Sequence, residues 1–247
     1  MHGGELIKVS TAAFRKSLGD DLRGIIAAGS LPNNDFSSNW SDLDLILVVN
    51  EVCYDVKVKI LKTIRVLEKK TGVKHGINVV SVTEVTAPKD PAKNLDGKTL
   101  QALLECHYDK TRLVYTKFNV SKLYFPNKQV VKEYTAYNMS LFRLRNRKKL
   151  ISLKNSDFKE IVKREIRACF TVLKLAVQYH KNIKNFNKSY VLECAIKIFP
   201  DYDFSCLNNF NKYISEHKDV NKTILKKQLQ TAEYFIENFT NYFIETK

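Results

Sequence analysis

The sequence is poor in cysteine, and its thiols do not form pairs. Five Cys are scattered over 247 residues, with no Cys-x-x-Cys spacing among them. An odd, dispersed set of this kind excludes a disulfide framework and a zinc site built from paired cysteines. We therefore expect reduced thiols in a cytoplasmic protein. The chain is long enough to form a hydrophobic core without covalent cross-links.

Long apolar runs are also missing. No run approaches the roughly 18 residues that a membrane-spanning helix requires, and residues 1–10 lack the apolar segment of a signal peptide. Internal repeats and low-complexity tracts are absent as well. These absences predict a cytoplasmic chain without a membrane partner.

Acidic residues are scarce in the second half of the chain. Residues 1–116 contain 16 Lys and Arg against 14 Asp and Glu, whereas residues 117–247 contain 25 against 12, so that +13 of the net charge of +15 lies there. One interpretation is a compositional bias that produces solvated, lysine-rich helix faces. The other is a surface that faces nucleotide phosphates or nucleic acid.

The first half alternates short apolar runs with helical patterns. Residues 23–30, 43–49 and 76–82 are typical of strands, and 111–116 is a candidate for a fourth. Residues 55–72 have a helical apolar period that ends at a glycine. We expect a mixed sheet with helices over residues 1–116.

The second half has almost only helical patterns. Apolar residues recur at helical spacing along residues 158–177 and 224–243, and these aromatics are typical of a core rather than a ligand cage. A less regular stretch, 117–128, predicts a linker. The fold class is therefore α+β, with an all-α helical bundle over residues 129–247.

One short stretch concentrates residues that suggest chemistry. An apolar run ends at Gly29-Ser30, ten residues follow, and Ser41-Asp42-Leu43-Asp44 then opens the next apolar run. Side chains two apart on a strand point to the same face, roughly 6–7 Å apart. Two carboxylates held so close repel each other, and a divalent cation between them removes that cost.

The Gly29-Ser30 turn suits the same task. Glycine lets the backbone approach a phosphate closely, and the serine hydroxyl with neighbouring N–H groups binds phosphate oxygens. Two Mg²⁺ ions about 3.5–4 Å apart would clamp the attacking and leaving oxygens of a phosphoryl transfer. The alternative is an edge strand with a polar face, which explains the two acids but not the preceding turn.

The stretch "LGDDLRGIIAAGSLPNNDFSSNWSDLDLILVV" resembles the nucleotidyltransferase superfamily that shares the DNA polymerase β palm. Within it, the chain is most similar to bacterial aminoglycoside nucleotidyltransferases of the streptomycin/spectinomycin type. Their C-terminal segment resembles "NKSYVLECAIKIFPDYDFSCLNNFNKY", residues 187–213. The resemblance implies an N-terminal nucleotidyltransferase domain followed by a helical bundle.

The resemblance also implies roles for individual residues. Gly29 and Ser30 would hold the terminal phosphates of ATP or another NTP, with Ser41 as a further nucleotide-binding residue. Asp42 and Asp44 would bind Mg²⁺ at a two-metal catalytic centre. Lys188 would reach the triphosphate from the bundle, and its alternative is an exposed surface lysine.

The chain departs from the family pattern at the general base. The family places a third acid on the next strand, where this sequence has Asn78, which is assigned to the catalytic group by position although an amide cannot accept a proton at neutral pH. Glu133 or Glu165 of the helical half are alternatives. Lone histidines are weaker ones, because most are structural: His75, His107 and His180. Transfer by metal positioning alone and an inactive nucleotide-binding relative also stay open.

These observations predict transfer of a nucleoside monophosphate, AMP above all, to an acceptor hydroxyl. Kinship favours an aminoglycoside-type antibiotic, and hence a role in antibiotic resistance. The basic second half favours tRNA, another RNA or a different anionic acceptor, although no RNA-binding motif is present. The sequence does not determine the oligomeric state.

Overall fold

The structure is a computed structural model that forms two compact units, residues 1–130 and 131–247. The residues that the structure describes are 3–33, 36, 41–151, 158–181, 183, 185–216 and 222–246.

A four-stranded sheet organises the first unit, with the strand order β3-β2-β1-β4. β1 is antiparallel to both β2 and β4, whereas β2 and β3 are parallel, so the sheet is mixed. The bounds of the strands are Leu22–Ala28 for β1, Leu43–Val49 for β2, His75–Ser81 for β3 and Leu113–Thr116 for β4.

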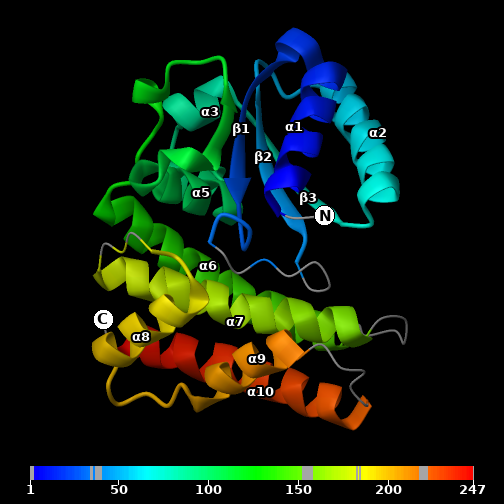
Figure 1. The fold of residues 1–247 in the computed structure, drawn as a ribbon. Helices are drawn as coiled ribbons and strands as arrows, with labels where there is room; N and C mark the ends of the chain where they lie inside the picture. Colours follow the sequence, from blue (N-terminus) through cyan, green and yellow to red (C-terminus); the bar gives the residue numbers. More distant parts are fainter. Residues whose placement is uncertain are drawn as a thin grey trace. The chain divides into compact units, whose positions relative to one another are not determined.

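One face of this sheet is covered by α1 (Gly3–Leu18) and α2 (Tyr54–Thr71), as Figure 1 shows. Alternate residues of β2, Leu43, Leu45 and Leu47, are fully buried in this core. The strand that the sequence predicted over residues 43–49 is therefore confirmed. α2 ends at Gly72, which adopts a left-handed φ of 69° as the C-cap.

The opposite face of the sheet carries the other half of β2. Ile46 and Val48 are fully buried on this face, while Asp44 is the polar member of the same row. The segment that follows β3 contains α3 (Val82–Thr86), α4 (Pro91–Asn94) and α5 (Gly97–Tyr108). α5 packs on this face, as the contacts of its first turn with Asp44 show. Short 3₁₀ turns, Gly19–Asp21, Lys110–Arg112 and Val120–Lys122, precede β1, precede β4 and follow β4.

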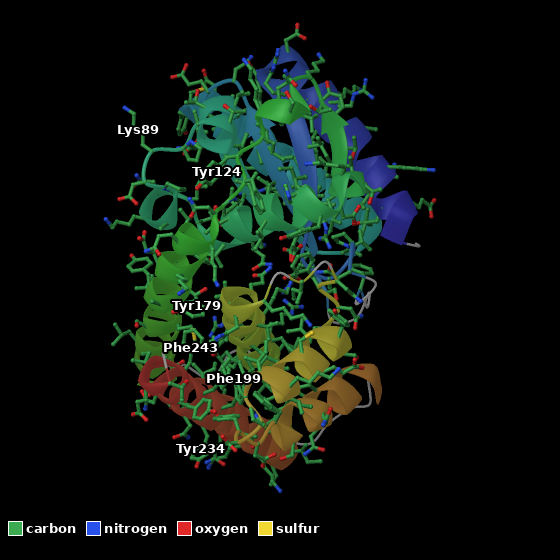
Figure 2. All side chains as sticks on the ribbon, turned by 90° about the vertical axis from the view of Figure 1, so that its left-hand side faces the viewer. Lys89, Tyr124, Tyr179, Phe199, Tyr234 and Phe243 are labelled. Atoms are coloured by element: carbon green, nitrogen blue, oxygen red, sulfur yellow. The ribbon has the colours of Figure 1, made fainter. Side chains whose placement is uncertain are left out.

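The second unit consists of helices in the residues that the structure describes. α7 and α10 pack along each other, with the ring centroids of Tyr179 and Phe243 5.1 Å apart. Figure 2 shows Phe199 and Phe243 within the bundle and Tyr234, which is 72% exposed, on its outside. The helices are α6 (Lys128–Ile151), α7 (Phe158–His180), α8 (Lys188–Ile198), α9 (Ser205–Glu216) and α10 (Lys222–Glu245).

The mixed sheet followed by a helical region confirms the predicted α+β class. The five cysteines are free thiols, as expected, and burial raises the pKa of Cys106 to about 12, which makes it a poor nucleophile. Among the helices that the structure describes, none is both long and apolar enough to cross a membrane.

Candidate functional site

Asp44 lies where three strands come together at one end of the sheet. It is the second residue of β2, and its register partners are Ala28, the last residue of β1, and Gly76, the second residue of β3. The Gly29-Ser30 turn follows β1 directly, so it lies beside Asp44 although the two are 15 residues apart. The Asp44 side chain is 20% exposed.

Two glycines flank the Asp44 carboxylate. Gly29 has a left-handed φ of 72°, and a Cβ there would overlap Asp44 Oδ2. A Cβ at Gly76 would overlap the other oxygen, Oδ1. Both positions therefore require glycine for the carboxylate to keep its place, and Gly29 requires it for the turn as well.

The cation beside Asp44 is Lys98, which sequence reasoning missed. Its Nζ lies 2.6 Å from Asp44 Oδ1. Lys98 stands in the first turn of α5, whose N-cap Asp96 accepts hydrogen bonds from the backbone N–H groups of Lys98 and Thr99. A lysine beside a helix N-terminus is electrostatically unfavourable, and this was the one sequence signal that could have pointed to it.

Asn78 lies on β3, two residues after Gly76, and its side chain is on the same face of the sheet as that of Asp44. Its register partner is Ile46, and its Nδ2 donates to Asp96 Oδ1 at 2.5 Å. Since both oxygens of Asp96 already accept hydrogen bonds within the first turn of α5, Asp96 acts here as a helix cap. The amide group of Asn78 is thus held by Asp96 through its Nδ2.

A buried polar network fixes the turn after β1. Asn33 donates from Nδ2 to the carbonyl oxygen of Gly29 at 2.8 Å, and its backbone N–H donates to that of Ser30 at 3.2 Å. The Arg112 guanidinium donates to Asn33 Oδ1 and, at 2.6 Å, to Glu105 Oε2. The network therefore shapes the candidate phosphate-binding turn from behind.

Ser41 and Asp42 immediately precede β2 and are partly exposed. The backbone N–H of Leu43 donates to the carbonyl of Lys74 at 2.8 Å and starts the ladder to β3. Six positions of the loop that leads to Ser41, 34–35 and 37–40, lie outside the described residues. The structure thus brings Gly29 against Asp44. Ser30 directly follows Gly29 in the sequence, and Ser41 and Asp42 lie two to three residues before Asp44.

Lys188 belongs to the second unit. It is the first residue of α8, follows the N-cap Asn187, and holds its ammonium 5.7 Å from the ring centroid of Phe170. Of the alternative bases in this unit, Glu165 is 3% exposed with Oε1 3.2 Å from Arg164, whereas Glu133 is exposed.

The histidines named as weaker alternatives have structural surroundings. His75 is buried, with Nε2 3.0 Å from the Ser10 hydroxyl and Nδ1 2.9 Å from the carbonyl of Val73. Burial lowers the pKa of His75, although the Val73 carbonyl and the charge of Glu68 act in the opposite direction. Stacking partners hold the other two: His107 on Phe125, and His180 edge-on to Phe199.

Asp42 and Asp44 fit a divalent cation that takes most of its other ligands from phosphate oxygens and water. Over the described part of the chain, no group of three or more His, Cys, Asp or Glu side chains could hold a metal ion. Two carboxylates, Asp42 and Asp44, suit Mg²⁺ when phosphate oxygens and water complete the shell, because Mg²⁺ in nucleotide sites is commonly held by one or two carboxylates.

Comparison with solved structures finds a likeness over nearly the whole chain. Spectinomycin adenyltransferase AAD(9) from Enterococcus faecialis, solved with ATP and spectinomycin, matches with a TM-score of 0.53 and 15% sequence identity, covering 94% of this chain and 98% of that one. No protein-family model matches the sequence, and no curated protein matches it significantly. At this identity the likeness concerns the fold: the chain has a nucleotidyltransferase fold with a helical C-terminal region.

Proposed function

We propose that the protein is a metal-dependent nucleotidyltransferase that moves AMP from ATP to an acceptor hydroxyl. The observation that carries the proposal is the contact between the Gly29 turn and the Asp44 carboxylate. The proposal is supported by this contact, between a turn that suits phosphate and a carboxylate that suits a cation, on a fold shared with an adenyltransferase that was solved with ATP.

The residues would divide the work as follows. Backbone N–H groups at Gly29-Ser30, together with the hydroxyls of Ser30 and Ser41, bind the triphosphate. Asp42 and Asp44 hold Mg²⁺, which supplies charge neutralisation for the phosphates when bound. The acceptor oxygen forms a bond to the α-phosphorus, the bond to the bridging oxygen breaks, and pyrophosphate leaves.

Asn78 would orient the acceptor rather than remove its proton. Its Nδ2 is engaged with Asp96, which turns the amide so that its carbonyl oxygen is the group left to accept a hydrogen bond from the acceptor hydroxyl. The acceptor proton then leaves to water or to a phosphate oxygen.

Two acceptor classes follow from different observations. The neighbour's spectinomycin supports an aminoglycoside-type antibiotic and a role in resistance. The net charge of +13 on residues 117–247 supports an anionic acceptor such as tRNA, because a cationic drug would be repelled by a basic surface. A non-catalytic nucleotide-binding module is the alternative of a different class.

The test is transfer of label from [α-³²P]ATP with Mg²⁺, using spectinomycin, streptomycin and bulk tRNA as separate acceptors. Transfer of AMP to one acceptor, with release of pyrophosphate, supports the proposal. Asp42→Asn and Asp44→Asn should each lower the rate by at least about 10²-fold, as expected for loss of a group that acts in the transition state.

Asp20→Asn is the matched control, because Asp20 is an exposed carboxylate that pairs with Lys117 and lies before β1, away from the turn. Near-normal turnover in either site variant would overturn the metal assignment. ATP binding without transfer to any acceptor would favour the non-catalytic alternative.

A further inference from the structure

Lys98 is a cation placed inside the candidate nucleotide site, and the roles assigned above do not use it. Resting on the proposed function, we propose that Lys98 is a nucleotide-binding residue that exchanges partners. Its ammonium pairs with Asp44 while no divalent cation is bound, and it pairs with a phosphate oxygen of ATP once Asp44 serves as a metal ligand.

The first support is the space that the ammonium occupies. Lys98 Nζ lies 2.6 Å from Asp44 Oδ1 and 3.1 Å from the position of a Cβ on Gly76. Gly76 is the register partner of Asp44 on β3. Because Gly76 has no side chain, the space beside Asp44 Oδ1 is open, and the ammonium of Lys98 fills it. The group next to this oxygen is therefore a lysine and not a third acid.

A second support is the local cost of putting lysine at this position. The first turn of α5 carries the positive end of the helix dipole, which favours an acid such as the N-cap Asp96 and disfavours a cation. Helix propensity therefore does not explain Lys98. An interaction outside the helix does, and Asp44, 54 residues away in sequence, provides it.

The third support is a comparison with two surface ion pairs of this unit that also join residues far apart in the sequence. Lys59 with Asp21 and Lys117 with Asp20 are surface pairs whose side chains are all more than 40% exposed. In the Lys98–Asp44 pair the exposures are 36% and 20%. This pair is the more enclosed one, and it lies beside the Gly29 turn rather than on the open surface.

Charge balance explains why the partners would exchange. Asp42 and Asp44 bring two negative charges, and the lysine reduces the sum to one, which weakens the attraction for a free divalent cation. ATP brings its own negative phosphates. When ATP arrives with its cation, the displaced ammonium finds a phosphate oxygen within the same site, and lysine is a common phosphate ligand as a point charge.

The experiment measures binding, not turnover, in the full-length protein. Mn²⁺ binding without nucleotide is followed by electron paramagnetic resonance, and Mg²⁺-ATP binding by isothermal calorimetry. Lys98→Met should tighten Mn²⁺ binding about tenfold, because the competing cation is gone, and should weaken Mg²⁺-ATP binding about tenfold, because a phosphate ligand is gone. Lys98→Arg, which keeps the charge, should restore most of the ATP affinity.

Lys93→Met is the matched control, since Lys93 is exposed, pairs with Asp90 and lies on the neighbouring helix α4. It should change neither constant. Circular dichroism checks that each variant is folded, and Lys98→Gln takes the place of Lys98→Met if the latter unfolds.

The outcomes separate the two proposals. If the wild type binds Mg²⁺-ATP and the Lys98 variants bind both ligands as tightly as it does, the exchange is wrong and the proposed function stands. Weaker Mn²⁺ binding in Lys98→Met also contradicts the exchange, because it would make the lysine a support for the carboxylate rather than its competitor. If the wild type binds neither Mn²⁺ nor ATP, both proposals are overturned.

Discussion

At the scale of single residues, the site depends on glycine at two positions, Gly29 and Gly76, which flank the Asp44 carboxylate. Gly29 combines a φ of 72° with a Cβ position that overlaps the Asp44 carboxylate, so alanine there meets a backbone penalty and a steric one. Gly72, the C-cap of α2, has nearly the same φ of 69° but open space around it. The two glycines therefore separate the general cost of a left-handed alanine from the specific cost at the site.

We predict that Gly29→Ala and Gly72→Ala each lower the free energy of unfolding by about 1–2 kcal/mol, through the backbone term that they share. Gly29→Ala alone should weaken Mg²⁺-ATP binding, by more than tenfold, because the added methyl displaces Asp44. Urea unfolding and isothermal calorimetry measure the two effects. Equal ATP affinities in the two variants would remove Gly29 from the nucleotide site.

His75 gives the first unit a dependence on pH. The neutral ring donates from Nδ1 to the Val73 carbonyl and accepts the Ser10 hydroxyl at Nε2, which ties β3 to α1. Burial, the largest cause, lowers the pKa of His75 below its ordinary value of 6.5. The unfolded chain then binds the proton more readily, so stability is complete above about pH 6.5 and falls as the pH drops below it.

We predict that the wild type loses stability between pH 7.5 and pH 5.5 with a slope of at most one proton, about 1.4 kcal/mol per pH unit. His75→Gln should be less stable at pH 7.5, but its stability should change less over this range. Urea unfolding of both proteins at the two pH values measures the difference. Parallel losses in the two proteins would assign the pH dependence to other groups.

At the scale of elements, the sequence predicted what local pattern determines. The apolar run over residues 43–49 predicted β2, and Gly72 predicted the end of α2. Local pattern does not reveal partners that are far apart in the chain. Lys98 meets Asp44 across 54 residues, and Arg112 meets Asn33 across 79, because the sheet brings their elements together.

The hydrogen-bond network of Asn33 links the turn after β1 to other elements of the first unit. It connects the turn after β1 to α5 through Glu105 and to the 3₁₀ turn before β4 through Arg112. Asn33 is 7% exposed, so removal of its amide leaves a buried guanidinium and the Gly29 carbonyl short of a partner. Buried groups left in this way cost about 1–3 kcal/mol.

We predict that Asn33→Ala lowers the free energy of unfolding by about 1–3 kcal/mol and weakens ATP binding about tenfold, because the turn is no longer held. Asn50→Ala is the control: its amide also bonds a backbone carbonyl, that of Asp20, but it is exposed and follows the far end of β2. It should leave ATP affinity unchanged. Loss of stability in Asn33→Ala without loss of ATP affinity would make the network purely structural.

At the scale of the whole molecule, the fold does not identify the acceptor, whereas the charge of the chain distinguishes the acceptor classes. The shared fold extends over 94% of the chain and includes the helical region, yet a fold hosts many functions and does not choose a substrate. The positive charge is concentrated in residues 117–247. Phe239 and Phe243, which the sequence assigned to the core side of α10, are buried. Charge is thus the surface property that distinguishes the acceptor classes.

We predict that bulk tRNA binds the protein with an affinity that falls steeply with salt, with a log–log slope that corresponds to several phosphate contacts, each worth about 0.7–0.9 in the slope. Lys226 and Lys227, adjacent exposed lysines on α10, should contribute: Lys226→Gln/Lys227→Gln should lower both the affinity and the slope. Lys69→Gln/Lys70→Gln, an adjacent exposed pair on α2 in the less basic first unit, is the control and should change neither. Filter binding from about 50 to 200 mM salt measures the slopes.

A flat response, or no binding at low salt, would show that the basic charge does not serve nucleic acid and would favour a small-molecule acceptor. A steep slope that both variants reduce equally would indicate attraction by the net charge of the chain rather than by a surface of the helical unit.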